Sequence, residues 1–453
     1  MEVNIESPVV SIFNDLPIMD VMDLKLNQDW IKQSPDSSST VLSILAKYRD
    51  RINTGDKKFN LPLVNLDTGN SAPVCSKPYR VSEDRRIAIK EQIDKWLDKG
   101  IIRESTSPWA SPCVVVAKQL ADGSIKRRVC GCFMRVNDLL RRETFPIPNM
   151  QDLFDELSGS TVFSVIDLEN AFLQLPLRET DKEKTAIITG EGLFEFNFLP
   201  FGISNASEVM QRTMSRLFGK YRGKFAVSFI DDLCVHSKDR SAHPEHLEIV
   251  FNILADYGLI INLPKCRFFR DRVLYLGCWI DGKSIWPDSK NVETVRNWPY
   301  PTSAKQVRQF LGCSSFYRRF IKDFSNRTAA LRELTKKNAK FIWTAYHQEE
   351  FQDIKGALTE KPVLRLFEVG RDTVVRTDAS DLGLGVILEQ RYPNGLHPVF
   401  YASQAFTHHA KKWVATEKEC FAIMFALKKF HKYLQGIQLL VMTDCHFYVG
   451  YFL

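Results

Sequence analysis

Residues 225–236 read FAVSFIDDLCVH, in which two short apolar runs flank a pair of aspartates. Runs of this length, rich in aromatic and β-branched residues, predict two strands joined by a tight turn, with Asp231 and Asp232 at the bend. A further strand is predicted at residues 162–166, and Asp167 follows it directly. Strand ends within one sheet can bring such side chains together. We therefore expect a sheet that gathers three carboxylates at one place.

Each of these aspartates also has a purely structural interpretation. Asp167 could cap the segment that follows it, and Asp231 with Asp232 could form an exposed turn, because Asp is common in both settings. For any one of these positions the structural interpretation is favoured. For the three together the metal-binding interpretation gains weight, because three carboxylates suit two hard Mg²⁺ ions. Two such ions about 3.5–4 Å apart can activate a hydroxyl nucleophile and stabilise a departing pyrophosphate.

The composition fits a globular protein with a polyanionic partner. Apolar residues make up 44% of the 453 positions and include 31 Phe, enough for sizeable cores. Lys and Arg exceed Asp and Glu by 61 − 54 = +7, which mildly favours binding to phosphates. The ten Cys form no CxxC pair, and no apolar run approaches the ~18 residues that a membrane span needs. We expect reduced thiols inside a cell and no membrane partner.

A second acidic pattern lies near the end of the chain. Three strand-like runs, a long amphipathic helix predicted over 416–434 and one more strand follow each other there. Asp378 ends the first run, Glu417 and Glu419 lie early in the helix, and Asp444 follows the last strand. The two glutamates could simply be an acidic first turn, which the helix dipole favours.

The ordered motifs of the chain resemble those of gypsy-type LTR retrotransposon polymerases over roughly residues 54–449. The central ones are FSVIDL at 163–168, LPFGISNA at 199–206 and FIDD at 229–232. Flanking motifs are PYR at 78–80, GII at 100–102, SPWASP at 107–112, KCRF at 265–268, YLG at 275–277, FLG at 310–312 and FYRRF at 316–320. Their order and spacing match that family.

The resemblance implies an α+β fold. We expect a right-hand polymerase with fingers, palm and thumb and a helical connection, followed by a partial α/β ribonuclease H-like domain. The expected divisions are a mostly irregular linker at 1–75 with at most one helix near 41–51, fingers and palm at 76–281, thumb and connection helices at 282–368, and the truncated ribonuclease H-like domain at 369–453.

Roles in the polymerase site follow from the same resemblance. Asp167, Asp231 and Asp232 would hold two Mg²⁺ ions, with Mn²⁺ as the alternative metal. Phe172 matches the family's aromatic gate, where a ring clashes with a ribose 2′-hydroxyl and so selects deoxynucleotides. Gln211 matches a glutamine that lines the nucleotide pocket.

Two basic residues complete the expected substrate site. Arg128 matches the fingers arginine that contacts the incoming triphosphate, a contact that suits guanidinium geometry. Lys265 could lie near the phosphates or be an ordinary surface lysine.

The resemblance also assigns the second acidic pattern. Asp378, Glu419 and Asp444 would hold the metals of a ribonuclease H site that hydrolyses RNA in RNA–DNA hybrids. Glu419 is chosen over Glu417 because the apolar run CFAI follows it directly. The sequence stops before the family's last helix and fourth carboxylate, so we expect this activity to be impaired.

The leading hypothesis is an RNA-directed DNA polymerase that uses RNA and DNA template-primers, RNA–DNA hybrids and dNTPs. By resemblance it would act in the cytoplasm or in virus-like particles. Cys132-Phe133-Met134 stand where the family has Asp-Tyr-Arg. This departure motivates the alternative, an inactive or domesticated remnant that binds nucleic acid without catalysis. The sequence indicates no oligomeric state.

Overall fold

The computed structural model describes residues 35–53, 61–119, 125–360, 363–443 and 450–452. The chain forms two compact units. Unit 1 comprises Met1–Leu153 and Val162–Arg270, and unit 2 comprises Phe154–Thr161 and Asp271–Leu453. Both contain helices and mostly antiparallel sheets, so the expected α+β class is confirmed. Among the described helices, none combines the length and apolar character needed to cross a membrane.

The central sheet of unit 1 is built from the predicted strands, in the order β7-β8-β4-β9. These are β7 (Ala226–Phe229), β8 (Asp232–Ser237), β4 (Val162–Asp167) and β9 (Arg267–Arg270). All neighbouring pairs are antiparallel. Helices α8 (Ala206–Phe218) and α9 (His243–Asp256) contribute buried residues to the same core as β4 and β8. This core fixes the ends of β4 and β8.

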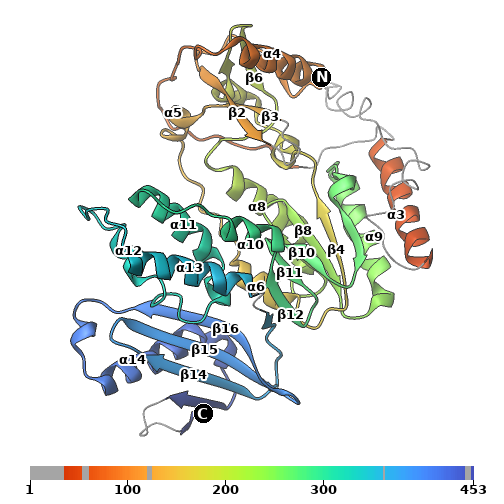
Figure 1. Cartoon of the computed structure of the whole chain (residues 1–453). Coiled ribbons are helices and arrows are strands. Elements are labelled where there is room, and N and C mark those ends of the chain that lie inside the picture. The colour runs from red at the N-terminus through yellow and green to blue at the C-terminus, as the bar shows by residue number, and fades with distance from the viewer. Residues whose placement is uncertain (1–34, 54–60, 120–124, 361–362, 444–449, 453) are drawn as a thin grey trace. The chain divides into compact units, whose positions relative to one another are not determined.

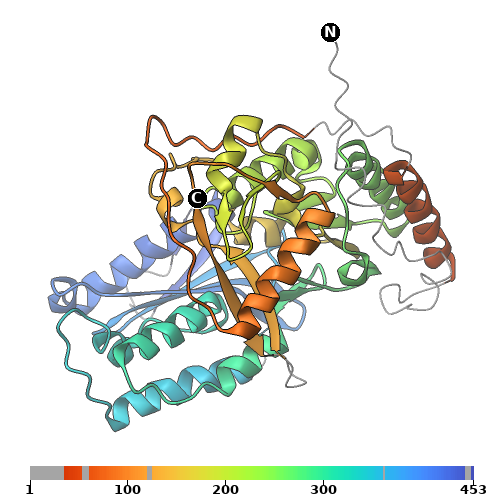
Figure 2. The ribbon, with the colours of Figure 1, turned by 90° about the horizontal axis from the view of Figure 1, so that it is seen from above.

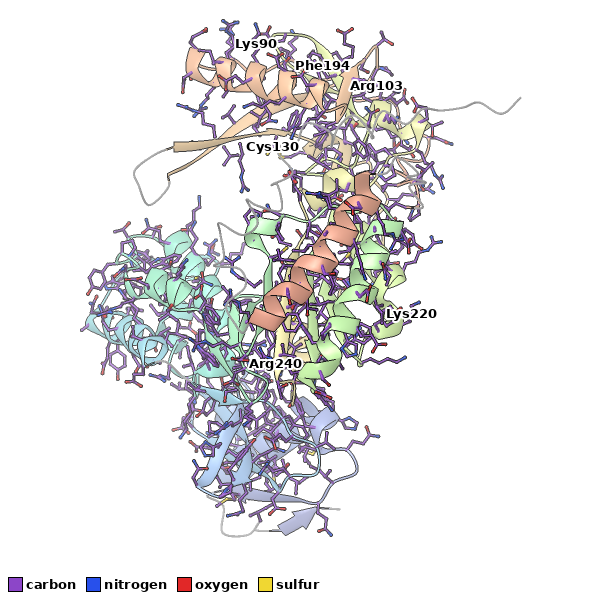
Figure 3. The ribbon with its side chains drawn as sticks, turned by 90° about the vertical axis from the view of Figure 1, so that its right-hand side faces the viewer. Lys90, Arg103, Cys130, Phe194, Lys220 and Arg240 are labelled. Carbon is purple, nitrogen blue, oxygen red and sulfur yellow. The ribbon has the colours of Figure 1, made fainter. Side chains whose placement is uncertain are left out.

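A second sheet of unit 1 has the order β1-β6-β5-β2-β3. Its strands are β1 (Ile102–Glu104), β6 (Leu193–Phe196), β5 (Ile187–Ile188), β2 (Ser111–Gln119) and β3 (Ile125–Gly131). Helix α4 (Glu83–Asp98) buries Ile89 and Ile93, as its apolar spacing predicts. Figure 3 shows Lys90 of α4 with Arg103 and Phe194 of the sheet at the same end of unit 1.

The segment expected to be mostly irregular contains helix α3 (Pro35–Asn53), longer than the helix predicted near 41–51. Figures 1 and 2 both show α3 alongside α9. Val41 and Leu45 are buried against unit 1, and the Tyr48 hydroxyl donates to the Leu259 carbonyl. The Tyr48 ring lies edge-on to Phe251 of α9, with 5.2 Å between ring centroids. Helix α3 is therefore part of the core of unit 1.

Unit 2 begins with a small sheet and a helical layer. The sheet has the order β10-β11-β12-β13, with β10 (Val273–Tyr275), β11 (Cys278–Ile280), β12 (Ser284–Pro287) and β13 (Leu364–Arg365). The helices are α10 (Ser289–Arg296), α11 (Ala304–Phe316), α12 (Ala329–Glu333) and α13 (Ala345–Thr359). Phe310 and Phe351 are fully buried between them, with ring centroids 4.5 Å apart.

The second part of unit 2 is a five-stranded sheet in the order β16-β15-β14-β17-β18. The strands are β14 (Thr373–Ala379), β15 (Gly383–Tyr392), β16 (Gly395–Ala405), β17 (Leu439–Thr443) and β18 (Gly450–Phe452). The helix predicted over 416–434 is divided into α14 (Ala415–Lys429) and α15 (His431–Leu434). Helix α14 packs on the sheet through Ala422 and Ala426. Because β14 and β17 are parallel, their carboxyl ends lie at the same edge.

Candidate functional site

The three aspartates of unit 1 meet where β4 ends and β8 begins. Asp167 and Asp232 are direct partners in the antiparallel register, so their side chains share one face of the sheet. Phe229 also pairs with Asp232, which leaves Ile230 and Asp231 as a two-residue turn. The register of β4 with β8 thus pairs Asp167 with Asp232, and the β7–β8 turn carries Asp231; the binding of metal by these three residues stays a prediction.

The turn is held in an unfavourable backbone conformation by a buried side chain. Ile230 has φ +56°, a region that β-branched residues avoid. Its N–H donates to Gln211 Oε1 over 2.7 Å, and Gln211 on α8 is only 1% exposed. Gln211 also donates through Nε2 to Ser215 Oγ at 3.2 Å. Gln211 therefore anchors the carboxylate turn, and its contact with a nucleotide stays a prediction.

The carboxylates repel one another. Burial, reinforced by the charge of Asp167, raises the pKa of Asp231. Burial and then the charges of Asp231 and Asp167 raise the pKa of Asp232 to about 6. Lys265 partly opposes both shifts, and its Nζ lies 3.2 Å from Asp167 Oδ1. Near neutral pH the site holds more negative charge than its neighbours compensate, which favours the binding of a cation.

The donor chemistry of this cluster fits a divalent cation. In the described part of the chain, no group of three or more Asp, Glu, His or Cys side chains is arranged so that it could hold a metal ion. The three groups are nevertheless all carboxylates, the oxygen donors that Mg²⁺ and Mn²⁺ prefer. Their mutual repulsion is also of the kind that a divalent ion relieves.

Phe172 lies on the short helix η2 (Ala171–Gln174), which begins four residues after Asp167. The Phe172 ring is half-buried and meets Phe201 edge-on, with centroids 5.4 Å apart. Gln174 holds the segment in place, because its amide accepts from Ile260 N at 2.8 Å and donates to the Ile260 carbonyl at 2.9 Å. The expected gate residue therefore stands on a fixed backbone.

The turn that carries Phe201 depends on Gly202 and on a residue that the sequence did not single out. Gly202 has φ +99°, and a Cβ there would lie 3.2 Å from the Gly131 carbonyl. Asn137 donates to the Gly202 carbonyl at 2.8 Å and accepts from Ser204 N at 2.9 Å. A polar side chain that bridges two distant segments leaves no periodic signal in the sequence, so Asn137 could not be found from it.

Arg128 forms no hydrogen bond or ion pair with the three described aspartates, and its contact with a triphosphate stays a prediction. It is exposed on β3, opposite Val116, and its side chain forms no hydrogen bond or ion pair with another described residue. Nearby, Met134 is 65% exposed, and Phe133 is 1% exposed. Cys132 Sγ lies 4.0 Å from the Tyr79 hydroxyl. Of the three residues that stand in place of the family's Asp-Tyr-Arg, Phe133 is therefore buried in the core, Cys132 is partly buried and Met134 is exposed.

The second acidic pattern is arranged differently. Glu419 is 9% exposed, and its two oxygens accept from Ala379 N and from Thr443 Oγ1, each at 3.0 Å. Asp378 is exposed at the end of β14. Glu417 instead accepts from Val414 N at 3.1 Å, so it caps α14. Asp444 lies outside the described residues.

The comparisons with known proteins follow the same division. Residues 129–280 match the family model "Reverse transcriptase (RNA-dependent DNA polymerase)", and residues 343–441 match "RNase H-like domain found in reverse transcriptase". The retrovirus-related Pol polyprotein from transposon 297 of Drosophila melanogaster is 33% identical over 381 residues, covering 84% of this chain and 36% of the polyprotein. The transposon Tf2-3 polyprotein of Schizosaccharomyces pombe is 31% identical over 389 residues, covering 84% and 29%.

The solved structures support the fold. The foamy viral protease-reverse transcriptase dRH in complex with ds DNA aligns with a TM-score of 0.81 and 24% identity, over 94% of this chain and 75% of that chain. The expected polymerase architecture with a ribonuclease H-like domain is therefore confirmed. The chain spans about a third of the length of the curated relatives it matches.

Proposed function

This chain carries a reverse transcriptase domain followed by a ribonuclease H-like domain and is homologous to retrotransposon Pol polyproteins, and from this premise we propose that it is an RNA-directed DNA polymerase. It would add dNTPs to a primer 3′-hydroxyl on an RNA or DNA template. The observation that carries the proposal is the pairing of Asp167 on β4 with Asp232 on β8, next to Asp231 in the β7–β8 turn. The divisions at 75/76, 281/282 and 368/369 are kept as proposed subdomain boundaries.

The chain's own residues supply the positioning. Asp167, Asp231 and Asp232 would hold two divalent ions. When bound, such ions activate the 3′-hydroxyl and neutralise charge on the transferred phosphoryl group. Gln211 keeps the turn that bears Asp231 in place. The Phe172 ring, supported by Phe201, would exclude a ribose 2′-hydroxyl.

Two groups would act on the substrate's charge. Lys265, which now faces Asp167, can neutralise part of the carboxylate charge or turn to a phosphate. Arg128 is exposed, so its guanidinium is accessible to a triphosphate from solution. The foamy viral structure holds double-stranded DNA. By analogy we propose a template-primer as the partner, and the cytoplasm or a virus-like particle as the place of action.

Primer extension on an RNA template with Mg²⁺ and dNTPs tests the proposal. We expect extension by the wild type and its loss in Asp231→Asn. Asp94→Asn is the matched control, since Asp94 is an exposed carboxylate on α4 of the same unit. We also expect Phe172→Ala to incorporate ribonucleotides more readily.

A folded wild-type protein that binds template-primer without extending it would overturn the polymerase proposal. That result would favour the alternative, a remnant that binds nucleic acid without catalysis. Cys132 and Met134 would then be replaced by Asp and Arg. Recovery of extension would assign the loss of activity to those two positions.

We propose that hydrolysis of RNA in RNA–DNA hybrids is weak. Both oxygens of Glu419 are already engaged by Ala379 N and Thr443 Oγ1, whereas Asp378 is exposed. A hybrid-cleavage assay with Mn²⁺ or Mg²⁺ should show slow cleavage that Glu419→Gln removes and Glu417→Gln retains. Cleavage as fast as primer extension would contradict this proposal.

A further inference from the structure

Unit 2 contains a cavity at the free edge of its five-stranded sheet. Its volume is about 400 Å³, within the range of small-ligand sites. β16 is the outermost strand on its side among the described strands, and its residues 400–405 form one wall. Figure 1 shows β16 and α14 in this unit. Phe425 and Lys429 of α14 form a second wall, and Arg318, Ser325 and Arg332 form a third.

The charge of the cavity has one sign. Arg318, Arg332 and Lys429 line it together with neutral residues, and no acidic side chain is among the lining residues. None of the three forms an ion pair with a described residue. The charge of Glu350 acts on Arg332, but the Glu350 carboxylate already accepts hydrogen bonds from Ala330 N and Leu331 N. The cavity therefore presents three cations to whatever enters it.

Burial and the charge of a neighbouring cation lower the pKa values of two of these three groups. Desolvation and then the charge of Arg318 lower the pKa of Arg332. The same two causes, in the same order, lower the pKa of Lys429. An anion between the three groups would remove the repulsion and stabilise their charged forms.

A fourth cation lies behind the aromatic wall. Arg319 is 8% exposed, and its three guanidinium nitrogens have no hydrogen-bond partner among the described residues. Its guanidinium carbon lies 5.0 Å from the centroid of Phe400, and Lys429 Nζ lies 5.8 Å from the same centroid. Contacts with the rings of Phe154 and Phe320 explain how this charge is tolerated. Its field nevertheless adds to that of the three lining cations.

We propose that this cavity binds the phosphate of a nucleotide, with the base against Phe400 and Phe425. Guanidinium groups match phosphate oxygens, and aromatic rings stack on bases of any sequence. Ser403 Oγ accepts from Ser325 N at 2.9 Å, so its own proton is free to donate to the ligand. The nucleotide could be free in solution or belong to a single strand. The site lies in unit 2, whereas the aspartate cluster lies in unit 1, so the inference does not rest on the proposed polymerase activity.

Equilibrium binding to the whole chain in EDTA tests this inference, because removal of divalent ions suppresses nucleotide binding at carboxylates. The probes are fluorescent dAMP, a short oligothymidylate and unphosphorylated adenosine. We expect Arg332→Gln with Lys429→Gln to weaken binding of dAMP or the oligonucleotide at least about tenfold. We also expect the slope of log K against log salt to become shallower by about one to two. Lys428→Gln, an exposed neighbour on α14, should leave binding unchanged.

The probes distinguish a free nucleotide from a single strand as the source of the phosphate, and the variants show whether the cavity binds it. A loss confined to dAMP identifies a free nucleotide, and a loss confined to the oligonucleotide identifies a single strand. Lys429→Arg should retain binding, because it keeps the charge while changing the side chain. The inference is overturned if adenosine binds as tightly as dAMP, or if the double variant, folded by circular dichroism, binds both phosphorylated probes like the wild type.

Discussion

The two acidic clusters of this protein use similar residues but differ in what surrounds them. In unit 1, Asp231 and Asp232 are partly buried beside Asp167, and their pKa values are raised by burial and mutual repulsion. In unit 2, Glu419 is buried, but the backbone of β14 and the hydroxyl of Thr443 already donate to it. The first cluster costs stability until a cation arrives, whereas the second adds stability to the fold. The presence of carboxylates alone therefore does not distinguish a site that favours cation binding from one whose carboxylate already accepts hydrogen bonds within the fold.

The largest expected effect is on catalysis in unit 1. Asp232→Asn should lower primer extension on the order of a thousandfold or more, as expected when one member of a cooperating set is removed. Single-turnover extension measures the effect, with Asp94→Asn as the control. If the variant retained more than a tenth of the wild-type rate, Asp232 would not be essential for catalysis. The cluster of unit 1 would then not differ from that of unit 2 in the way described.

The next effect concerns pH. Burial lowers the pKa of His243 to about 3, and its ring nitrogens lie 2.8 Å from the hydroxyls of Ser164 and Ser237. A lowered folded pKa means that the stabilisation is complete above about 6.5, the unfolded value, and is lost as pH falls towards 3. At pH 4.5 the loss from this residue is about 3 kcal/mol.

Urea unfolding at pH 7 and pH 4.5, followed by hydrogen exchange in each unit, measures this loss. His243→Gln should reduce the pH dependence of unit 1, whereas His431→Gln, a change in unit 2, should not. Equal pH dependence in the two variants would remove His243 as the cause.

A smaller effect is expected from the buried glutamate of unit 2. Glu419→Ala removes the acceptor for Ala379 N and Thr443 Oγ1, and we expect unit 2 to lose about 2 kcal/mol of unfolding free energy. Glu417→Ala removes only a helix cap and should cost about 1 kcal/mol or less. The urea midpoints of the two variants provide the measurement. The reverse order would mean that Glu417 is the glutamate that holds the sheet edge.

The smallest effect has the opposite sign. The raised folded pKa corresponds to a penalty of at most about 3 kcal/mol on the carboxylate at pH 7. Asp232→Asn should stabilise unit 1 by about 1–2 kcal/mol, because the buried amide that replaces the carboxylate retains part of the desolvation cost. For a raised acid the penalty is absent below about 3.8 and is complete above about 6, so the gain should disappear near pH 4. Thermal unfolding at both pH values in EDTA checks this prediction. A destabilised variant at pH 7 would show that Asp232 is held by interactions stronger than the repulsion.

Much of this arrangement could be predicted from local sequence. The hairpin at 225–236 has apolar runs on both sides of its turn, and α4 has a regular apolar face, so both were found. Gln211 was assigned to a nucleotide pocket by family position, yet it is buried and bonded to Ile230 N. Asn137 was not found at all. Both side chains act on residues that are distant along the chain, and the sequence carries no periodic trace of such contacts.

Helix α3 has a practical consequence for anyone who produces this protein. Val41, Ile44, Leu45 and Tyr48 cover apolar residues of unit 1. A recombinant version that starts at residue 61, after α3, would leave Phe251 and its neighbours open to water. Such a patch promotes aggregation. Poor solubility of the shortened protein would then reflect the missing helix, and expression should begin upstream of Pro35.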